Sequence, residues 1–392
     1  MAQKDNPPPT SNTTIVYDGA IYNSQRRGGI SRYFTRLIEN VAWLQPEWRI
    51  ELHVNPQQGV PVAPLPNGSN VRVRTRPYLR PRLPCYPFNA AAREWMWRAA
   101  RPSLLHSTLY RQPIFSPCPV VTTIHDVVEI LFPQLFSGNA GHLTAQWKRR
   151  SAETAEAVIA VSMTSKSDIV RLFGIDPQKV HVVYHGIDER FSKRPLAAEG
   201  RCRQLGVRKP YLLYVGQREQ HKNFKVLWQA FQSSELKAWN LVLVGGADRL
   251  EAWIDPTSVQ GRLIHLSDVS DEDLLALYAE ADFLIFPSLY EGFGFPALEA
   301  MACGTGVIAS DIPSTREVCR DACRYFDPND QHSLVNAIVA AAKAETTIRL
   351  IEAGRRQAMA YTWRKCARET LAIYTELIGA RRTPKNRRLL LP

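Results

Sequence analysis

The strongest constraint on the fold is a repeated alternation of short β-rich runs with amphipathic helical segments. Runs rich in β-branched residues predict strands at residues 14–18, 50–54, 120–124, 158–162 and 180–185. Between the first two, apolar residues from Ile30 to Val41 follow the i, i+3, i+4, i+7 spacing of a helix with one buried face. Because strands that alternate with helices pair in parallel, the predicted fold class is α/β with Rossmann-like parallel sheets.

The alternation is interrupted by a polar segment and then starts again. Strands are predicted a second time at residues 211–215, 241–244, 263–266, 283–287 and 307–310. We therefore expect a disordered tail over 1–13, a first domain over 14–190, a linker over 191–209, a second domain over 210–362, an amphipathic helix over 363–378 and a basic tail over 379–392. Open parallel sheets bind ligands at the carboxyl ends of their strands, so we expect a cleft between two facing domains.

Composition excludes several classes of protein. A chain of 392 residues that is 45% hydrophobic and 22% charged is an ordinary globular protein, neither disordered nor collagen-like. No run approaches the roughly 18 apolar residues of a membrane span, and the first 14 residues are polar and proline-rich, unlike a signal peptide. The expected location is therefore the cytoplasm. Seven cysteines without a C-x2-C pair predict reduced thiols and no zinc site.

Two segments account for the whole formal charge of +12. Residues 71–101 contain eight arginines and one glutamate, and residues 379–392 contain five basic residues and no acidic one. In the first segment the arginines alternate with aromatic residues, a mixture typical of surfaces that bind anionic lipid head groups. An anionic membrane surface is therefore a candidate partner. The alternative is a solvated loop followed by a core helix; nucleic acid would also suit the charge but is not the expected partner.

The most informative motif follows the predicted strand at 283–287. Glu291 and Glu299 lie eight positions apart around Gly292, Phe293 and Gly294, and Pro296 favours the first turn of a helix. Glycine amides at a helix N-terminus suit an anionic or hydroxyl-rich ligand, and the glutamates would accept hydrogen bonds from sugar or ribose hydroxyls. The same segment also matches a G-x-G-x-x-A dinucleotide fingerprint through Ala297, so NAD binding stays open as an alternative.

Further functional groups are expected at three other strand ends. Arg218 and Lys222 follow a strand, next to a helix start, and could stabilise a diphosphate without a metal. In the first domain, Gly28 and Gly29 would permit close approach of a ligand to backbone amides, and His125 with Asp126 ends a buried strand. By contrast, the apparent D-x-D motif at 271–273 is explained by Ser270 as a helix N-cap.

Together, the segments GGISRYF, TIHD, GQREQHKNF and EGFGFPALEAMACGTGVIASDIPSTREV resemble the retaining glycosyltransferases of family 4, over residues 14–378. The resemblance implies the two-Rossmann GT-B fold, with the last helix crossing back to the first domain. It further implies a donor nucleoside diphosphate sugar as co-substrate and no metal cofactor.

The resemblance also implies roles for individual residues. Arg218 and Lys222 would hold the donor diphosphate, and Glu291 with the Gly292–Gly294 amides would hold the donor sugar. Glu299 would hold the ribose, while His125 and the Gly29 loop would face donor and acceptor from the first domain. One departure is His221, which stands directly before the lysine where many members have arginine.

The resulting hypothesis is transfer of a hexose, with mannose the best guess, to a hydroxyl of a glycan or lipid-linked saccharide. The protein would act in the cytoplasm, with a peripheral position on the inner face of the membrane as a second expectation. Two alternatives stay open: an NAD-dependent epimerase or dehydrogenase, and an inactive glycan-binding scaffold of the same fold.

Overall fold

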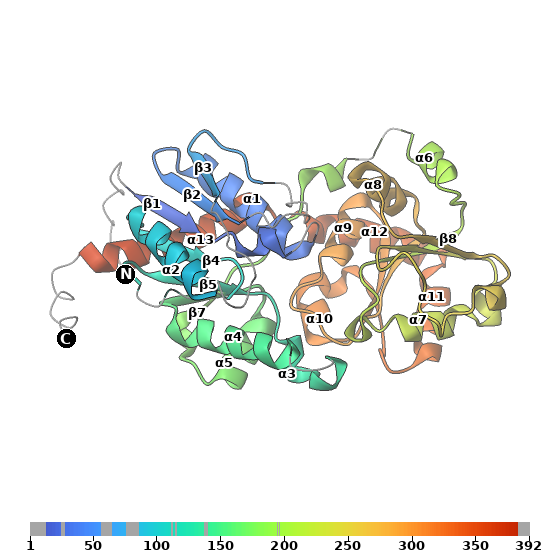
Figure 1. Cartoon of the computed structure of the whole chain (residues 1–392). Coiled ribbons are helices and arrows are strands. Elements are labelled where there is room, and N and C mark those ends of the chain that lie inside the picture. Colours follow the sequence, from blue (N-terminus) through green and yellow to red (C-terminus); the bar gives the residue numbers. More distant parts are fainter. Residues whose placement is uncertain are drawn as a thin grey trace, which may run out of the picture. The chain divides into compact units, whose positions relative to one another are not determined.

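The chain divides into two compact units, each organised around one parallel sheet (Figure 1). A computed structural model describes residues 13–24, 28–55, 65–75, 86–110, 113, 116–136, 140–193, 195 and 197–382. Unit 1 comprises the described residues of Met1–Ile130, Gly138–Gly186 and Trp363–Pro392, and unit 2 those of Leu131–Ser137 and Ile187–Thr362. The expected tails at 1–13 and 379–392 therefore lie mostly outside the described residues.

Unit 1 contains a seven-stranded parallel sheet in the order β3-β2-β1-β4-β5-β6-β7. Its strands are β1 (Thr14–Tyr17), β2 (Arg49–Val54), β3 (Val71–Thr75), β4 (Leu104–Ser107), β5 (Val120–Ile124), β6 (Ala157–Ala160) and β7 (Val180–Val182). The central strands are buried at every position, as expected for a parallel sheet covered on both faces. The strand order reverses between β1 and β4, which is the point where such sheets bind ligands.

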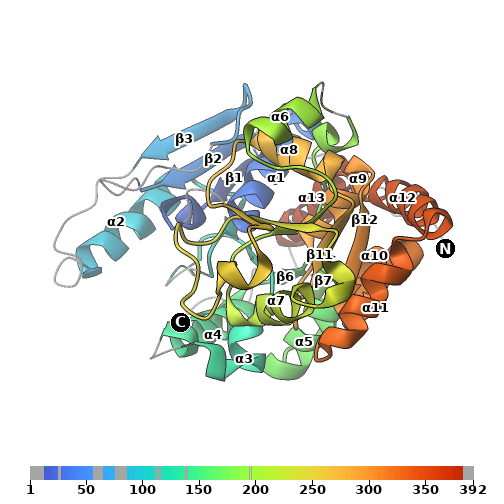
Figure 2. The same cartoon turned by 90° about the vertical axis from the view of Figure 1, so that its right-hand side faces the viewer.

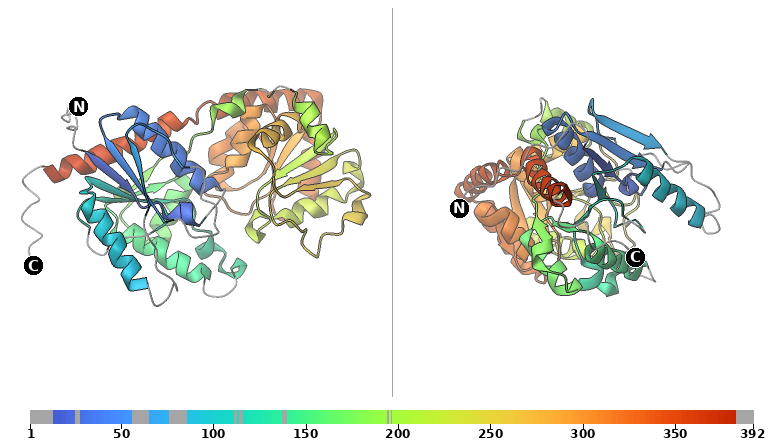
Figure 3. Two further views of the ribbon diagram at one scale, coloured as in Figure 1. Left: turned by 45° about the horizontal axis from the view of Figure 1, so that its top comes forward. Right: turned by 90° about the vertical axis from the view of Figure 1, so that its left-hand side faces the viewer.

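The helices of unit 1 come from both ends of the chain. They are α1 (Gly29–Leu44), α2 (Tyr86–Ala99), α3 (Val128–Leu131, whose last residue belongs to unit 2), α4 (Ala140–Thr154), α5 (Met163–Phe173) and α13 (Trp363–Arg382). The predicted last helix is confirmed as α13, which packs alongside α1 and extends beyond residue 378 (left panel of Figure 3). Tyr374 on α13 hydrogen-bonds to His106 on β4 and to Tyr17 on β1. The end of the sequence is thus part of the core of unit 1.

Unit 2 contains a six-stranded parallel sheet in the order β10-β9-β8-β11-β12-β13. Its strands are β8 (Tyr211–Val215), β9 (Asn240–Val244), β10 (Leu263–Leu266), β11 (Phe283–Phe286), β12 (Gly306–Ser310) and β13 (Arg324–Phe326). The order reverses between β8 and β11, so the loops that follow these two strands mark the expected ligand position.

Helices cover this second sheet, and α9 and α12 lie side by side (Figure 2). They are α6 (Ala198–Gln204), α7 (Phe224–Phe231), α8 (Asp271–Glu280), α9 (Phe295–Cys303), α10 (Pro313–Cys319), α11 (Gln331–Ala341) and α12 (Ala344–Ala358). The predicted N-cap is confirmed, because Ser270 accepts a hydrogen bond of 3.0 Å from the amide of Asp273. Seven residues of the segment expected to be a linker form α6, which packs on α8 and belongs to unit 2.

Short 3-10 helices connect many of these elements. They are η1 (Ala20–Asn23), η2 (Pro133–Leu135), η3 (Pro177–Lys179), η4 (Glu189–Ser192), η5 (Gln220–Lys222), η6 (Ser234–Leu236), η7 (Pro256–Val259) and η8 (Arg320–Ala322). Among the helices in the described part of the chain, none has both the length and the apolar character needed to cross a membrane.

Candidate active site

In unit 2, the loops after β8 and β11 are joined by an ion pair and a backbone hydrogen bond. Lys222 Nζ lies 2.8 and 2.9 Å from the two carboxylate oxygens of Glu291. Ser288 Oγ donates to Glu291 Oε1 at 2.6 Å, and the Leu289 amide donates to the His221 carbonyl at 2.8 Å. Since β8 and β11 flank the reversal of strand order, the structure brings these two predicted residues together at the expected ligand edge.

This ion pair is accessible rather than sealed in the core. The side chain of Lys222 is 27% exposed and that of Glu291 is 12% exposed. The ammonium of Lys222 can turn from Glu291 to an anionic ligand. The carboxylate of Glu291 is then available to accept hydrogen bonds from other donors. The pair is therefore suited to bind a ligand that carries both anionic groups and hydroxyls.

The glycine loop leads directly into α9. Gly294 is the N-cap residue of this helix, with φ +108°, and it makes no side-chain cap hydrogen bond. A positive φ of this size strains residues that carry a Cβ atom, which explains glycine at this position. The side chain of Phe293 is buried and packs with ring centroids 5.6 Å from both Phe295 and Tyr361. Phe293 thus anchors the loop that carries Gly292 and Gly294 to the start of α9.

Glu299 lies one turn into α9 and is only 3% exposed. Its Oε2 accepts a hydrogen bond of 3.0 Å from the hydroxyl of Tyr278 on α8. Burial with a hydroxyl donor fixes the position of this carboxylate. Sequence reasoning missed Tyr278, which is part of the apolar repeat of α8 and there resembles any other core residue.

The guanidinium of Arg218 is directed to a different loop. Its side chain is 1% exposed, and its Nε lies 2.8 Å from the carboxylate of Glu251, in the loop after β9. Sequence reasoning grouped Arg218 with Lys222 as a pair of cations, but the structure gives each of them its own carboxylate. Nothing in the sequence pattern singles out Glu251 as a partner.

In unit 1, His125 ends β5 as a buried imidazole. It is 8% exposed, and its Nε2 has no hydrogen-bond partner among the residues that the structure describes. Its ring stacks on His185 at 5.3 Å and makes an edge contact with Tyr33 of α1 at 5.0 Å. Burial lowers the pKa of His125 to about 4, so the ring is neutral at physiological pH. The Nε2 atom of this neutral ring can form one hydrogen bond with a hydroxyl group of a ligand.

An ion-pair cluster lies directly beside His125. Lys148 of α4, with its side chain 3% exposed, donates to Asp126 at 2.8 Å and to Glu129 at 2.7 Å. Lys148 lowers the pKa of Asp126 to about 2 despite burial, and Asp126 in turn raises the pKa of Lys148. Sequence reasoning missed Lys148, although its helical spacing from the buried Ser151 indicates an inward-facing position.

Gly29 begins α1 and is exposed. The preceding carbonyl of Gly28 accepts hydrogen bonds of 3.1 Å from the Arg32 amide and from Ser31 Oγ, so the helix start is well defined. Tyr33, one turn further along α1, contacts His125. The two predicted elements of the first domain are therefore linked through one helix. Arg26 and Arg27 lie outside the described residues.

The basic segment 71–101 is described only in part. In β3, Arg72 and Arg74 are exposed, and on α2 Phe88 is 65% and Trp95 is 71% exposed. Because these two aromatic residues are seven positions apart, they lie on one face of the helix. Residues 76–85 and the basic tail from 383 onward lie outside the described residues.

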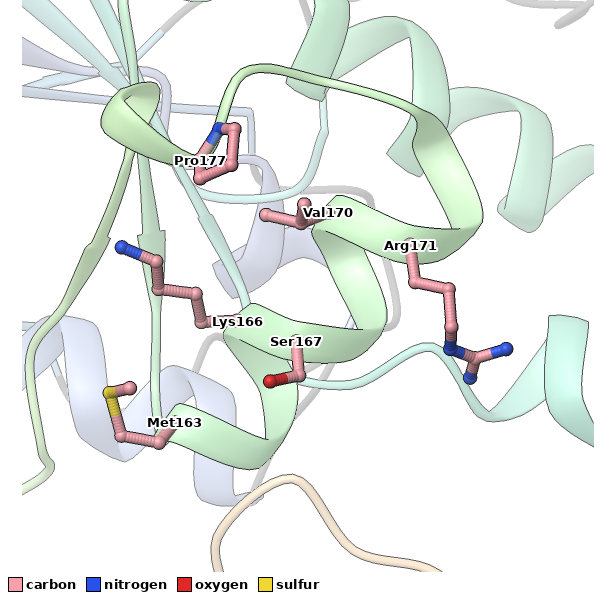
Figure 4. A pocket seen from close by; sticks show the side chains of 6 residues that line it. All are labelled: Met163, Lys166, Ser167, Val170, Arg171 and Pro177. Carbon is pink, nitrogen blue, oxygen red and sulfur yellow. The ribbon is translucent and has the colours of Figure 1, made fainter.

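A surface hollow of about 290 Å³ beside α5 contains no predicted site residue; Figure 4 shows the residues that line it, Met163, Lys166, Ser167, Val170, Arg171 and Pro177. Within the described ranges, no three or more His, Cys, Asp or Glu side chains gather in a group that could hold a metal ion.

The two parallel-sheet units, with ligand-suited loops at their strand ends and a last helix that returns to unit 1, define the class of two-Rossmann GT-B proteins. Solved structures support this class. The chain aligns with sucrose-phosphate synthase of Thermosynechococcus elongatus at a TM-score of 0.77 and 20% identity, covering 94% of this chain and 100% of that one.

Comparisons of sequence identify the family. Residues 27–191 match "Glycosyltransferase Family 4" and residues 203–357 match "Glycosyl transferases group 1". The O-antigen chain mannosyltransferase B of Escherichia coli is 30% identical over 268 residues, 65% of this chain and 69% of that protein. The O-antigen chain mannosyltransferase RfbU of Salmonella typhimurium is 29% identical over 226 residues, 55% of this chain and 59% of that protein. The chain belongs to the family 4, or group 1, glycosyltransferases, which are retaining hexosyltransferases.

Proposed function

We propose that the protein transfers a hexose, with mannose the best-supported sugar, from a nucleoside diphosphate sugar to a hydroxyl of a glycan or lipid-linked saccharide. The observation that carries this proposal is the accessible Lys222–Glu291 pair beside the start of α9, at the reversal of strand order in unit 2. The choice of mannose rests on relatives whose names describe mannosyltransferases of the O-antigen chain. These names also favour an acceptor in lipopolysaccharide synthesis.

In the proposed mechanism, donor binding replaces the internal ion pair. Lys222 turns from Glu291 to the diphosphate, whose charge is also favoured by the N-terminus of α9. Glu291, still oriented by Ser288, then accepts hydrogen bonds from the sugar hydroxyls. Glu299, fixed by Tyr278, is the proposed acceptor for the ribose hydroxyls. The neutral ring of His125 is the proposed partner of a further hydroxyl of the donor or acceptor.

The bond-forming step needs stabilisation of the leaving diphosphate more than it needs a strong base. As the anomeric C–O bond breaks, negative charge grows on the diphosphate, where a fixed cation and the amides of a helix start lower the barrier. The departing diphosphate takes the acceptor proton on the face that it leaves, and the new bond forms on that same face with retention. Glu291 orients the sugar and does not attack it.

The proposal is tested by ligand binding, which needs no knowledge of the acceptor. Thermal shift and calorimetric titrations would use GDP, UDP, ADP, dTDP and NAD, in EDTA, with wild type, Lys222→Ala and the exposed control Lys225→Ala. A ligand that binds the native state raises its stability in proportion to RT ln(1 + [L]/Kd). We expect one nucleoside diphosphate to bind without metal, to lose affinity in Lys222→Ala, and to keep it in Lys225→Ala.

The same titrations distinguish the rival functions. Binding of NAD and of no nucleoside diphosphate would favour an epimerase or dehydrogenase over a transferase. Binding of no nucleotide would favour a glycan-binding scaffold. The identity of the nucleoside diphosphate that binds would name the base of the donor.

We propose an anionic membrane surface as a second partner, with the protein on the inner face of the cytoplasmic membrane. The support is the exposed face of α2, where Phe88 and Trp95 stand in a segment that also contains the exposed Arg72 and Arg74. Sedimentation with vesicles containing phosphatidylglycerol would test it. We expect binding at low salt, and weaker binding for the double variant Phe88→Ser/Trp95→Ser. Failure of wild type to bind at low ionic strength would contradict the proposal.

A further inference from the structure

Arg218 is hydrogen-bonded inside unit 2 through all three nitrogens of its side chain. A guanidinium carries five N–H donors in a fixed planar arrangement. Nε donates to the Glu251 carboxylate, at 3.0 and 2.8 Å from its two oxygens. The remaining acceptors are the carbonyls of Gly245 (2.9 Å), Ala247 (3.3 Å) and Arg249 (3.4 Å), and Nη1 also lies 3.1 Å from His265 Nε2. With its side chain 1% exposed, Arg218 has each of its three side-chain nitrogens hydrogen-bonded inside unit 2.

The loop after β9 is shaped around this guanidinium. Gly246 has φ +83°, and a Cβ atom placed on it would lie 2.5 Å from Arg218 Nη1. Any side chain at this position would therefore displace the guanidinium. The close fit means that the loop 245–251 and Arg218 hold each other in place.

The contacts of Arg218 connect the ends of three adjacent strands. Arg218 itself stands in the turn after β8, its carbonyl partners and Glu251 stand in the loop after β9, and His265 is on β10. These strands are neighbours in the order β10-β9-β8. The turn that contains Arg218 also contains Lys222, four residues further on, which pairs with Glu291.

We propose that Arg218 is a positioning residue that binds no part of the donor. By anchoring the loop 245–251 to the turn after β8, it fixes that turn and thereby presents Lys222 to the donor diphosphate. This inference rests on the proposed function. It differs from the expectation that Arg218 and Lys222 share the diphosphate, because it assigns the anion to Lys222 and the start of α9 alone.

Positioning and direct binding give opposite results when Glu251 is changed. If Arg218 works through the loop, Glu251→Gln breaks the same anchor as Arg218→Gln, and both weaken nucleotide binding. If Arg218 binds the phosphates, loss of the Glu251 charge releases the guanidinium, and binding stays the same or tightens.

The experiment measures the Kd of GDP and UDP by calorimetry for the full chain. The variants are Arg218→Gln, Arg218→Lys, Glu251→Gln and the double variant Arg218→Gln/Glu251→Gln. Arg262 provides the matched control. Like Arg218 it donates to backbone carbonyls, here those of Leu236 and Trp239, but it lies at the opposite end of a strand, just before β10 begins. Thermal unfolding of each variant separates loss of stability from loss of affinity.

We expect Arg218→Gln and Glu251→Gln to weaken binding by a similar factor, roughly ten- to a hundredfold, as displaced binding groups do. The double variant should lose no more than either single one. Arg218→Lys should not restore affinity, because lysine lacks the planar set of five donors. Arg262→Gln should lower the melting temperature and leave Kd unchanged.

Several outcomes would overturn the inference. They are unchanged or tighter binding in Glu251→Gln, near wild-type affinity in Arg218→Lys, or equal loss of affinity in Arg262→Gln. If a variant fails to fold, a crystal structure of wild type with GDP or UDP decides. A guanidinium of Arg218 that still pairs with Glu251 supports the inference, and one that contacts a phosphate overturns it. Failure of wild type to bind any nucleoside diphosphate would instead count against the proposed function itself.

Discussion

The two units use buried polar groups in different ways. In unit 1 the candidate residue His125 is a neutral ring, and beside it the buried ammonium of Lys148 pairs with two carboxylates, Asp126 and Glu129, whose side chains are 31% and 11% exposed. In unit 2 the candidate groups Lys222 and Glu291 are charged and partly exposed. The charged pair of unit 2 is thus partly accessible to solvent, whereas the candidate residue of unit 1 is an uncharged, buried ring.

This difference separates structural charges from functional ones. A buried ion pair that loses one member leaves an uncompensated charge in the interior, so its main effect is on folding. A partly exposed pair contributes little to folding because water screens it, and its value lies in what it binds. Substitutions in the two units should therefore affect different measurements.

The largest expected effect is on the stability of unit 1. Lys148→Met leaves the carboxylates of Asp126 and Glu129 facing each other without a cation, and should lower the free energy of unfolding by about 3–5 kcal/mol. Denaturant unfolding would measure it, with Lys166→Met as the control on the neighbouring helix α5. Adding Glu129→Gln to Lys148→Met should restore part of the loss. Equal stability of the two lysine variants would contradict a structural role.

The next effect is on turnover, through unit 2. Glu291→Gln removes the charge that is proposed to orient the sugar and should lower kcat by roughly a hundredfold, or about 2.7 kcal/mol of barrier. Its melting temperature should change little, in contrast to that of Lys148→Met. Initial rates with the donor identified by titration would measure it, beside the exposed control Glu345→Gln. Turnover within about tenfold of wild type would remove Glu291 from the proposed mechanism.

A third effect follows from pH and belongs to unit 1. Burial lowers the pKa of His125 to about 4 and that of His106 to about 3, while the unfolded chain binds protons near pH 6.5. The stabilisation is therefore present above pH 6.5 and is lost as the pH falls toward 4. For His125 the loss between pH 7 and pH 5 is about 2 kcal/mol. Unfolding of wild type and His125→Asn at both pH values would measure it, and the variant should lose less stability on acidification.

The smallest effect is expected at an exposed pair in unit 2. Arg316 contacts both oxygens of Asp311, at 2.6 and 2.7 Å, yet both side chains are about half exposed. Arg316→Gln should cost less than about 1 kcal/mol of stability because solvent screens such pairs. Thermal unfolding at low and high salt would check it. A loss of stability comparable to that of Lys148→Met would show that the exposed pair stabilises the fold as much as the ion pairs of Lys148 do.

Much of the fold could be predicted because strands and helices each give the apolar residues a characteristic local spacing. The alternation of strands and helices predicted both parallel sheets, and the last helix was predicted from apolar spacing alone. Two strands of unit 1 were not predicted. β3 is an edge strand with exposed arginines, and β4 has only four residues, Leu-Leu-His-Ser, which are buried but too few and too mixed to show a period. Their places became clear only from the strands with which they pair.

The residues of the candidate site differ in the same way in how far they can be predicted. Residues carried by one continuous motif, such as Glu291, Gly294 and Glu299, could be found from their spacing. Partners from distant segments could not, since Glu251 is 33 residues from Arg218 and Lys148 is 22 residues from Asp126. The sequence therefore names candidate charged groups, but it does not show which of them a neighbour already pairs with.

The return of α13 to unit 1 has a consequence for the order of folding during synthesis. Unit 2 is complete once residue 362 has left the ribosome, whereas the core of unit 1 still lacks Tyr374, the partner of Tyr17 and His106. Domains emerging from the ribosome usually fold in the order of their synthesis. Here the half of the protein that is translated first must be the last to finish, and until then its unpaired apolar surface is exposed to chaperones.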